Sequence, residues 1–289
     1  MQQEDTAQYV SIIQSIESEL RALRGAIVSK SGSIHHTKKL NPYDLLTELD
    51  VAIEDKITSK LHSLTPNVPI VGEERGGDRS AKRHWLIDPI DGTIHFVRGN
   101  PFYCFMIALI VDGVPFASMI YNFATGDSFR AIKNGGAYMN GSTLRVSSRP
   151  VREAVVHTEV NLHSDENLVL QKLLSEQFRL VSLFCPGYEF SMIASGRAEG
   201  RICIDPFGKD YDFAPGALLV QEAGGVAKNL SGDDYRTSDS NIIVASSMEI
   251  YEALLLSVQK SRKSMLLPSK IGKAKLSEDL QSRYHSGKQ

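Results

Sequence analysis

The strongest constraint on the fold is a block of strand patterns between residues 85 and 160, with amphipathic helical patterns on both sides of it. Residues 105–111 are an almost unbroken apolar run that ends at an Asp-Gly pair, which is typical of a strand buried on both faces. Further strands are predicted at 85–87, 115–121, 127–132, 137–138 and 155–160, with glycine and asparagine turns between them. The pattern favours an α+β fold with mostly antiparallel sheets between layers of helices.

Apolar residues at three- and four-residue steps predict long helices over 6–29 and 45–64, and they place Asp50 near the start of the second, beside its apolar stripe. Helices are also predicted at 168–176, 190–195, 213–223 and 248–260, and strands at 69–72, 179–183, 202–204 and 241–245. Asp212 is a suitable N-cap for the helix over 213–223. Because no repeat or linker divides residues 1–259, we expect one body with halves of about 1–150 and 151–259.

Charge is distributed unevenly along the 289 residues. The net charge of −2 argues against nucleic acid as the main partner. Residues 260–289 contain eight Lys or Arg and two Asp or Glu, together with many serines and glycines. We expect this segment to be a flexible, solvated basic tail, with contact to an acidic partner as the alternative.

Cysteine usage and the amino terminus bear on the cellular location. The three cysteines, Cys104, Cys185 and Cys203, are an odd number and have no metal-type spacing, so we expect reduced thiols in the core of a cytoplasmic protein. The first residues lack the basic and apolar regions of a signal peptide. No apolar run approaches the length of a membrane span, so no membrane partner is expected.

The segment Trp85–Thr93 holds the most chemistry, because an apolar strand runs into a turn with two carboxylates three residues apart, Asp88 and Asp91. Hard cations such as Mg²⁺ prefer carboxylate, carbonyl and water oxygens. The amides of Gly92 and Thr93 can hold a phosphate if a helix begins there. Alone, Asp-Pro and Asp-Gly are ordinary turn formers, so the functional reading depends on carboxylates elsewhere in the chain, at Glu73-Glu74 and Asp212.

Together with their flanks, these residues resemble the inositol monophosphatase superfamily, the Mg²⁺-dependent, lithium-sensitive phosphatases. The matching blocks are DLLTELD at 44–50, GEE at 72–74, WLIDPIDGT at 85–93, GGAYMNG at 135–141, and Asp212 with EAGG at 222–225. The resemblance spans about residues 5–258. It implies a five-layered αβαβα sandwich with the metals between the two halves, and a homodimer.

The resemblance also implies roles for individual residues. The ligands of a first Mg²⁺ correspond to Glu73, Asp88 and the carbonyl of Ile90. The ligands of a second Mg²⁺ correspond to Asp88, Asp91 and Asp212. A contact with a weaker third ion corresponds to Glu73. Asp50 and Thr93 correspond to the pair that positions and deprotonates the attacking water, and the amides of Gly92 and Thr93 to the phosphate cradle. The catalytic set is therefore Asp50, Glu73 and Thr93. His95 departs from the usual family pattern, and we expect it to be structural or a solvent-facing neighbour of the phosphate.

Substrate choice is expected to depend on the segment before Asp212 and the helix before that segment. Asp205 falls where inositol-cleaving members carry an acidic residue that accepts from ring hydroxyls, and Glu189 falls near a second polar contact. With Asp210 they predict an acidic pocket, which suits polyol hydroxyls or an amine and disfavours a second phosphate.

Three functions follow. The first is a phosphomonoesterase for inositol monophosphate or a similar polyol phosphate. The second, with the same chemistry, is a phosphatase for histidinol phosphate or another amino-alcohol or sugar phosphate. The third is a non-catalytic binding protein on this fold, with the basic tail as its contact surface.

Overall fold

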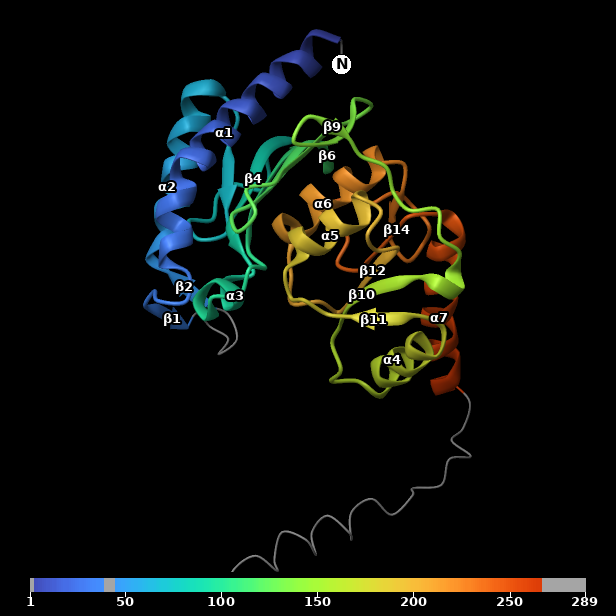
Figure 1. Ribbon diagram of the computed structural model, residues 1–289. Coiled ribbons are helices and arrows are strands. Elements are labelled where there is room, and N and C mark those ends of the chain that lie inside the picture. Colours follow the sequence, from blue (N-terminus) through green and yellow to red (C-terminus); the bar gives the residue numbers. More distant parts are fainter. Residues whose placement is uncertain (1–2, 39–44, 267–289) are drawn as a thin grey trace, which may run out of the picture.

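The computed structural model describes residues 3–38 and 45–266, and these residues form five layers (Figure 1). Helices α1 (Gln3–Lys30) and α2 (Glu48–Leu64) cover the outer face of a seven-stranded sheet. Helices α5 (Pro186–Ala194) and α6 (Asp210–Glu222) lie between that sheet and a five-stranded one. Helices α4 (Asp165–Gln177) and α7 (Met248–Leu266) cover the far side. The expected α+β sandwich with αβαβα layers is confirmed.

The first sheet follows the chain from one edge to the other. Its order is β3 (Ile70–Gly72), β4 (Arg83–Asp91), β5 (Cys104–Val111), β6 (Val114–Asn122), β7 (Ser128–Ile132), β8 (Gly136–Met139) and β9 (Ser142–Thr143). Only β3 and β4 are parallel; the remaining neighbours are antiparallel. The carboxyl ends of β3 and β4 therefore meet at one edge of the sheet.

The second sheet is mixed. Its order is β11 (Arg179–Val181), β10 (Val155–Val160), β12 (Gly200–Ile204), β14 (Ile242–Ala245) and β13 (Val226–Lys228). Strands β11, β10 and β12 are parallel, and β14 is antiparallel to β12 and β13. Smaller elements are the ribbon β1 (His36–Lys38) with β2 (Leu45–Thr47), the helix α3 (Thr93–Arg98) and a 3₁₀ turn at Val151–Glu153.

Strand β5 explains why the layers hold together, because it is buried on both faces as its sequence predicts. Phe105, Ile107 and Leu109 belong to the core beneath α1 and α2. Met106, Ala108 and Ile110 point the other way, into the core shared with α5 and α6. Alternate side chains of one strand thus join two cores, and burying such aliphatic side chains contributes roughly 1.5–3 kcal/mol each.

Two helix starts differ from the sequence-based expectation. Residues 45–47 form β2 rather than the first turn of α2, and Thr47 is the N-cap whose hydroxyl accepts from the Leu49 amide at 3.2 Å. Helix α6 begins at Asp210, so Asp212 is at its third position and Lys209 is the cap residue. The prediction of Asp212 as N-cap was therefore wrong, although its carboxylate still accepts from the Lys209 amide, at 2.6 Å.

Other boundaries shift by a few residues: α4 begins at Asp165, α5 covers Pro186–Ala194 and β11 ends at Val181. Helix α7 continues beyond residue 259, where the tail was expected to begin. Ser261 is buried, and Arg262 pairs with Glu166 of α4 at 3.2 Å. The rest of the expected tail, residues 267–289, and Asp44 of the first motif lie outside the described residues.

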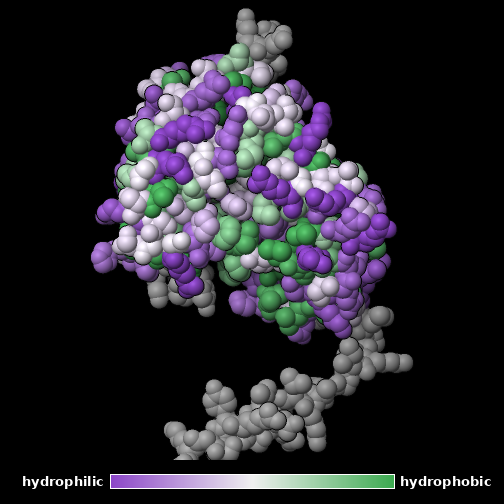
Figure 2. Space-filling view, in the orientation of Figure 1, coloured by the Kyte–Doolittle hydropathy of each residue, from purple (hydrophilic) through white to green (hydrophobic). Residues whose placement is uncertain are grey.

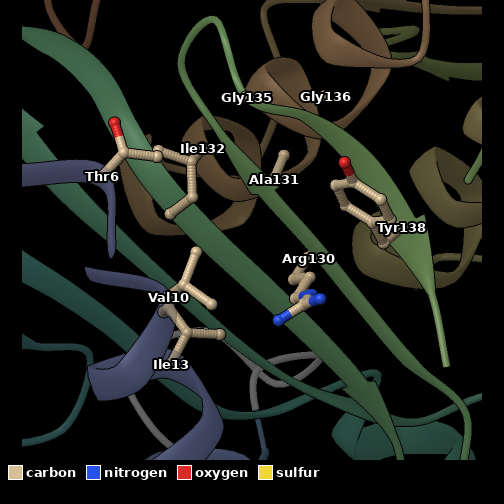
Figure 3. A pocket seen from close by; sticks show the side chains of 9 residues that line it. All are labelled: Thr6, Val10, Ile13, Arg130, Ala131, Ile132, Gly135, Gly136 and Tyr138. Carbon is tan, nitrogen blue, oxygen red and sulfur yellow. The ribbon is translucent and has the colours of Figure 1, made fainter. Parts of the chain in front are cut away.

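The two halves of the molecule differ in the hydropathy of their surfaces (Figure 2). Apolar colour gathers over the half that holds the five-stranded sheet, where the exposed large apolar side chains include Leu162, Phe184 and Phe207. A small pocket lies on the other half, between α1 and strands β7 and β8, near Val10 and Tyr138 (Figure 3). None of its lining residues is a carboxylate. Within the described residues, no helix has the length and apolar character to span a bilayer.

Candidate active site

Three carboxylates from two distant elements meet at the inner end of β4. Oxygen atoms of Asp88, Asp91 and Asp212 all lie within 4.8 Å of one another. In a regular strand, residues three apart point to opposite faces. The pairing register of β4 with β5 shifts between Asp88 and Asp91, and this irregularity allows both side chains to reach the same side. Both aspartates thus belong to the strand and not, as expected, to a turn after it.

Glu73 joins this cluster through the parallel pairing of β3 with β4. Gly72 is paired with Ile87, and the Glu73 amide donates to the Ile87 carbonyl at 3.0 Å. The chain therefore leaves β3 beside the point where β4 delivers Asp88. A side-chain hydrogen bond joins Glu73 to Asp88, so these two carboxyl groups lie next to each other.

Burial and mutual repulsion dominate the electrostatics of the cluster. Burial, followed by the charges of Glu73, Asp91 and Asp212, raises the pKa of Asp88 well above its usual value. The pKa of Asp212 is raised well above normal by burial and by Glu73 and Asp91. Burial raises the pKa of Asp91 to about 7, although the Gly187 amide, 2.7 Å from its Oδ2, partly offsets this effect.

The donor set fits a hard divalent cation. Among the described residues no hydrogen-bond donor reaches Asp88 Oδ1, which is fully buried. An unpaired buried carboxylate oxygen is costly, and a cation is the partner that removes this cost for Asp88, Asp91 and Asp212 together. The Ile90 carbonyl accepts the Thr93 hydroxyl at 2.8 Å and has a second lone pair for another partner.

Asp50 lies in the first turn of α2 and is fully buried, in contrast to the expected place beside the apolar stripe. Its Oδ2 accepts from the Thr47 amide at 2.8 Å and from the Thr47 hydroxyl at 2.5 Å. Burial raises the pKa of Asp50 to about 7, against the lowering effect of these two hydrogen bonds. The Thr93 hydroxyl donates to Ile90, so in this structure Asp50 and Thr93 are each held by their own partner.

Gly92 shapes the turn into α3. Its φ of +79° favours glycine, and a Cβ there would lie 2.4 Å from the Phe102 carbonyl. Thr93 is the first residue of α3, so the Gly92 and Thr93 amides belong to the start of a helix.

The two expected substrate residues are placed differently. Asp205 is exposed at the end of β12, has a φ of +47°, and accepts from the Asn167 side chain at 3.0 Å. Glu189 is buried in α5, where its carboxylate accepts from the Leu183 amide at 2.8 Å and pairs with Arg201. The placement of Glu189 does not support direct contact with a substrate. Asp205 remains accessible for one.

His95 has a connecting role. Its Nε2 donates to the Leu183 carbonyl, since a carbonyl can only accept, and Asn100 Nδ2 lies 3.4 Å from Nδ1. The ring thus ties α3 to the segment between β11 and α5, in agreement with the expected structural role.

Residues that support the site were not identified from the sequence. Glu54 of α2 is buried, and its carboxylate accepts from the amides of Glu74 at 2.9 Å and Arg75 at 2.8 Å. It therefore holds the loop that carries Glu73. A Cβ at Gly72 would lie 2.0 Å from Glu54 Oε1, so this contact also requires a glycine. The one feature of the sequence that could have identified Glu54 is its position one helical turn after Asp50.

A second support holds the segment before Asp212. Glu159 of β10 accepts from the Phe207 and Gly208 amides at 3.0 Å each, and it pairs with Arg201. Arg201 is buried in β12 and also pairs with Glu189. An arginine within an otherwise apolar strand was the signal for this network.

Glu54→Ala is expected to weaken the site without removing any carboxylate of the cluster. The loop amides of Glu74 and Arg75 lose their acceptor, which destabilises the fold by roughly 1–3 kcal/mol, and apparent metal affinity should fall on the order of 10- to 100-fold. Thermal denaturation and Mg²⁺ titration of the variant test this. Glu176→Ala, an exposed Glu-to-Ala change in helix α4, is the control, and equal effects of the two changes would contradict the role of Glu54.

The stability of the metal-free protein should fall as pH rises. Asp50 and Asp91 have folded pKa values of about 7 against 3.8 in model compounds, so between these values the folded state binds more protons than the unfolded state. The free energy of unfolding therefore decreases from about pH 4 to above pH 7, by roughly 2–4 kcal/mol for each group. We expect a lower Tm in EDTA at pH 8 than at pH 5 and recovery when Mg²⁺ is added. A Tm that rises with pH in EDTA would contradict this.

The structure thus places a buried carboxylate cluster, carried by β4 and α6, near the first turn of α3. A sequence profile of the Inositol monophosphatase family matches residues 3–263. Inositol monophosphatase 1 of Solanum lycopersicum is 32% identical over 253 residues, which cover 82% of this chain and 91% of that protein. The Nus factor SuhB of Pseudomonas aeruginosa is 31% identical over 229 residues, covering 75% and 83%.

The fold agrees with these relatives. The structure of a Thermotoga maritima IMPase superposes with a TM-score of 0.75 at 24% identity and covers 85% of this chain and 95% of that one. The chain belongs to the inositol monophosphatase family and is a phosphoric monoester hydrolase.

Proposed function

We propose that this protein is a Mg²⁺-dependent phosphomonoesterase that acts on inositol monophosphate or a similar small polyol phosphate. The observation that supports this most is the cluster of Asp88, Asp91 and Asp212, with Glu73 hydrogen-bonded to Asp88 and one buried Asp88 oxygen unpaired. Carboxylates this close repel one another without a cation.

The residues suit two or three Mg²⁺ ions. Glu73, Asp88 and the Ile90 carbonyl would hold the first, and Asp88, Asp91 and Asp212 the second, with Asp88 shared and Glu73 available to a third. When bound, such ions neutralise phosphate charge and favour ionisation of water.

The remaining chemistry is assigned to the chain itself. The Gly92 and Thr93 amides at the start of α3 orient the phosphate oxygens. Thr93 and Asp50 position the attacking water and accept its proton. With a pKa near 7, Asp50 suits a general base at neutral pH.

Asp205 is proposed to face the leaving group, because it is exposed and lies one short loop before Asp212. A carboxylate that accepts substrate hydroxyls discriminates against esters that lack them. Asp205→Ala should therefore weaken catalysis on inositol monophosphate by about 1–3 kcal/mol and leave an aryl phosphate nearly unaffected. Steady-state kcat/KM on both substrates tests this. Equal losses would assign Asp205 to the fold, where it holds Asn167.

Two alternatives remain within the proposal. Histidinol phosphate or another amino-alcohol or sugar phosphate would also suit an acidic rim at Asp205. A binding role is suggested by the relative named as a Nus factor.

Cytoplasmic location is supported by three unpaired cysteines, and a homodimer by the family resemblance alone.

A panel of phosphate esters assayed with Mg²⁺ tests the proposed activity. Inositol monophosphate should give the highest kcat/KM, and LiCl in the tens of millimolar, roughly where a weak oxygen-ligand site fills, should inhibit. A higher kcat/KM on histidinol phosphate would favour the first alternative. Absence of turnover on every ester would favour the binding role.

A further inference from the structure

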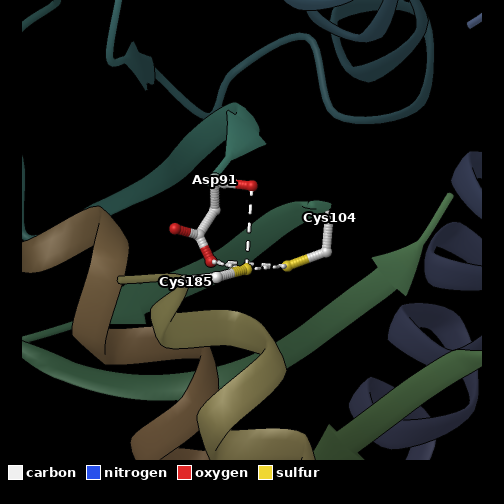
Figure 4. Close-up of side chains that lie close together, drawn as sticks. All are labelled: Asp91, Cys104 and Cys185. Carbon is white, nitrogen blue, oxygen red and sulfur yellow. Dashed lines mark hydrogen bonds between the residues drawn. The ribbon is translucent and has the colours of Figure 1, made fainter. Parts of the chain in front are cut away.

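Two of the three cysteines meet at Asp91, one of the clustered carboxylates (Figure 4). Cys104 of β5 and Cys185, which precedes α5, are 81 residues apart in the sequence, yet their sulfur atoms lie 3.9 Å apart. Both thiols are buried and point at the same atom, Asp91 Oδ2, at 3.4 Å from Cys104 and 3.2 Å from Cys185. The other Asp91 oxygen points away from the sulfurs in Figure 4.

The three atoms form a triangle of the size that a tetrahedral zinc ion requires. With Zn–S bonds of about 2.3 Å and Zn–O bonds of about 2.0–2.2 Å, tetrahedral angles place the sulfurs about 3.8 Å apart and each sulfur about 3.5 Å from the oxygen. The observed edges are 3.9, 3.4 and 3.2 Å. Because both sulfurs lie within hydrogen-bond distance of the same oxygen, a single ion can take the place of the thiol protons with little movement of the ligands.

Gly187 holds the Asp91 carboxylate in place and leaves space beside the two thiols. The Gly187 amide donates to Asp91 Oδ2 at 2.7 Å, which fixes the carboxylate as outer hydrogen bonds do at metal sites. A Cβ at Gly187 would lie 2.5 Å from the Cys104 sulfur and 2.8 Å from the Met106 sulfur. The glycine therefore provides the room beside the thiols, and a third sulfur lies near the same place.

We propose that Asp91, Cys104 and Cys185 form a site for a thiophilic divalent cation, with Zn²⁺ as the fitting ion, and that this site shares the Asp91 side chain with the carboxylate cluster. At a pH above the pKa of Asp91, which is about 7, binding breaks two S–H bonds, forms two Zn–S bonds and one Zn–O bond, and releases two protons to solvent; below that pH the Asp91 proton is released as well. Three protein ligands leave the fourth tetrahedral position for water or another small ligand. Thiolates are soft ligands that select Zn²⁺ over Mg²⁺.

The consequence for the enzyme rests on the proposed role of Asp91 as a Mg²⁺ ligand. Asp91 belongs to both groups of potential ligands, the one with the two thiols and the one with Asp88 and Asp212. Two divalent cations on one carboxylate repel each other, so Zn²⁺ at the thiols would weaken Mg²⁺ binding at the carboxylates and act as an inhibitor that Mg²⁺ opposes.

The test is a Co²⁺ titration of the full-length protein, reduced and freed of metal, without substrate. Cobalt is a spectroscopic substitute for zinc, and a thiolate-to-cobalt charge-transfer band appears only if sulfur coordinates. We expect the band in the wild type, its loss on addition of Zn²⁺, and release of two protons for each Zn²⁺ bound in a solution weakly buffered above the pKa of Asp91. Absence of the band in the wild type would overturn the proposal.

Cysteine variants identify which sulfur atoms coordinate the metal. Cys104→Ser and Cys185→Ser should each lower Zn²⁺ affinity on the order of tenfold or more and abolish the two-sulfur band. Cys203→Ser is the matched control, because Cys203 is equally buried and belongs to neither group of potential ligands among the described residues. Cys104→Ala and Cys185→Ala repeat the measurement, with thermal denaturation as a check of folding. An unchanged band in the Cys104 and Cys185 variants, or an equal loss in Cys203→Ser, would overturn the assignment.

Activity then separates this proposal from the proposed function. If the charge-transfer band forms but no phosphate ester is hydrolysed, the metal site stands and the phosphatase assignment fails. If Mg²⁺-dependent hydrolysis occurs without the band in the wild type, the thiophilic site fails and the phosphatase assignment stands.

Discussion

Asp88→Asn should lower kcat/KM for phosphate-ester hydrolysis on the order of a thousandfold or more, the largest loss expected of any single change. Asp88 is the carboxylate common to both proposed cation positions. It is hydrogen-bonded to Glu73, it lies within reach of Asp91 and Asp212, and no donor from residues 3–38 or 45–266 reaches its buried Oδ1. An amide keeps the shape of the side chain but removes its charge and turns one acceptor into a donor.

The measurement is a full kinetic comparison across Mg²⁺ concentration, with Asp165→Asn in the exposed first turn of α4 as the control for an Asp-to-Asn change. The Asp88 variant should also require more Mg²⁺ for half-maximal rate, and its metal-free form should melt higher at pH 8, because a buried charge is gone. Wild-type activity with an unchanged Mg²⁺ requirement would remove Asp88 from the cation site.

Asp50→Asn should lower kcat about 10²- to 10⁴-fold and change KM little, because the proposed role of Asp50 is toward the attacking water and not the bound ester. The asparagine carbonyl can still accept from the Thr47 amide and hydroxyl, which now bond Asp50 Oδ2. The start of α2 should therefore survive the change, and a loss of rate can be ascribed to the missing base.

Asp165→Asn, exposed in the first turn of α4, is the matched control here as well and should retain full activity. A rise in KM with kcat unchanged would assign Asp50 to substrate binding. A large fall in Tm would instead assign it to the helix cap.

The sequence predicted most of the helices and strands for a physical reason, whereas the number of layers followed from the family resemblance. The alternating burial of β5 and the amphipathic helices are local patterns, and local periodicity identifies such elements. Asp88 and Asp91 of the DPID segment could be singled out because they follow directly after an apolar run that is recognisable as a strand. The start of α2 was mispredicted because the apolar residues 45–47 fit either a helix or a strand, and only their pairing with β1 decides between the two.

Tertiary pairing explains what could not be predicted. The register shift that turns Asp88 and Asp91 to one side depends on β5. The Glu54 carboxylate meets amides twenty residues away, and the thiols of Cys104 and Cys185 meet across 81 residues. Glu189 was expected at the substrate, but Arg201 from a later strand holds its carboxylate in the interior.

The most direct test of the account is inorganic phosphate release from inositol monophosphate by the wild-type protein, first freed of metal with EDTA and then titrated with Mg²⁺. The account predicts a negligible rate in EDTA and a saturable return of activity with Mg²⁺, at a concentration that rises in the Asp88→Asn variant. Full turnover after rigorous removal of divalent cations would contradict the central claim that the carboxylate cluster works through bound metal.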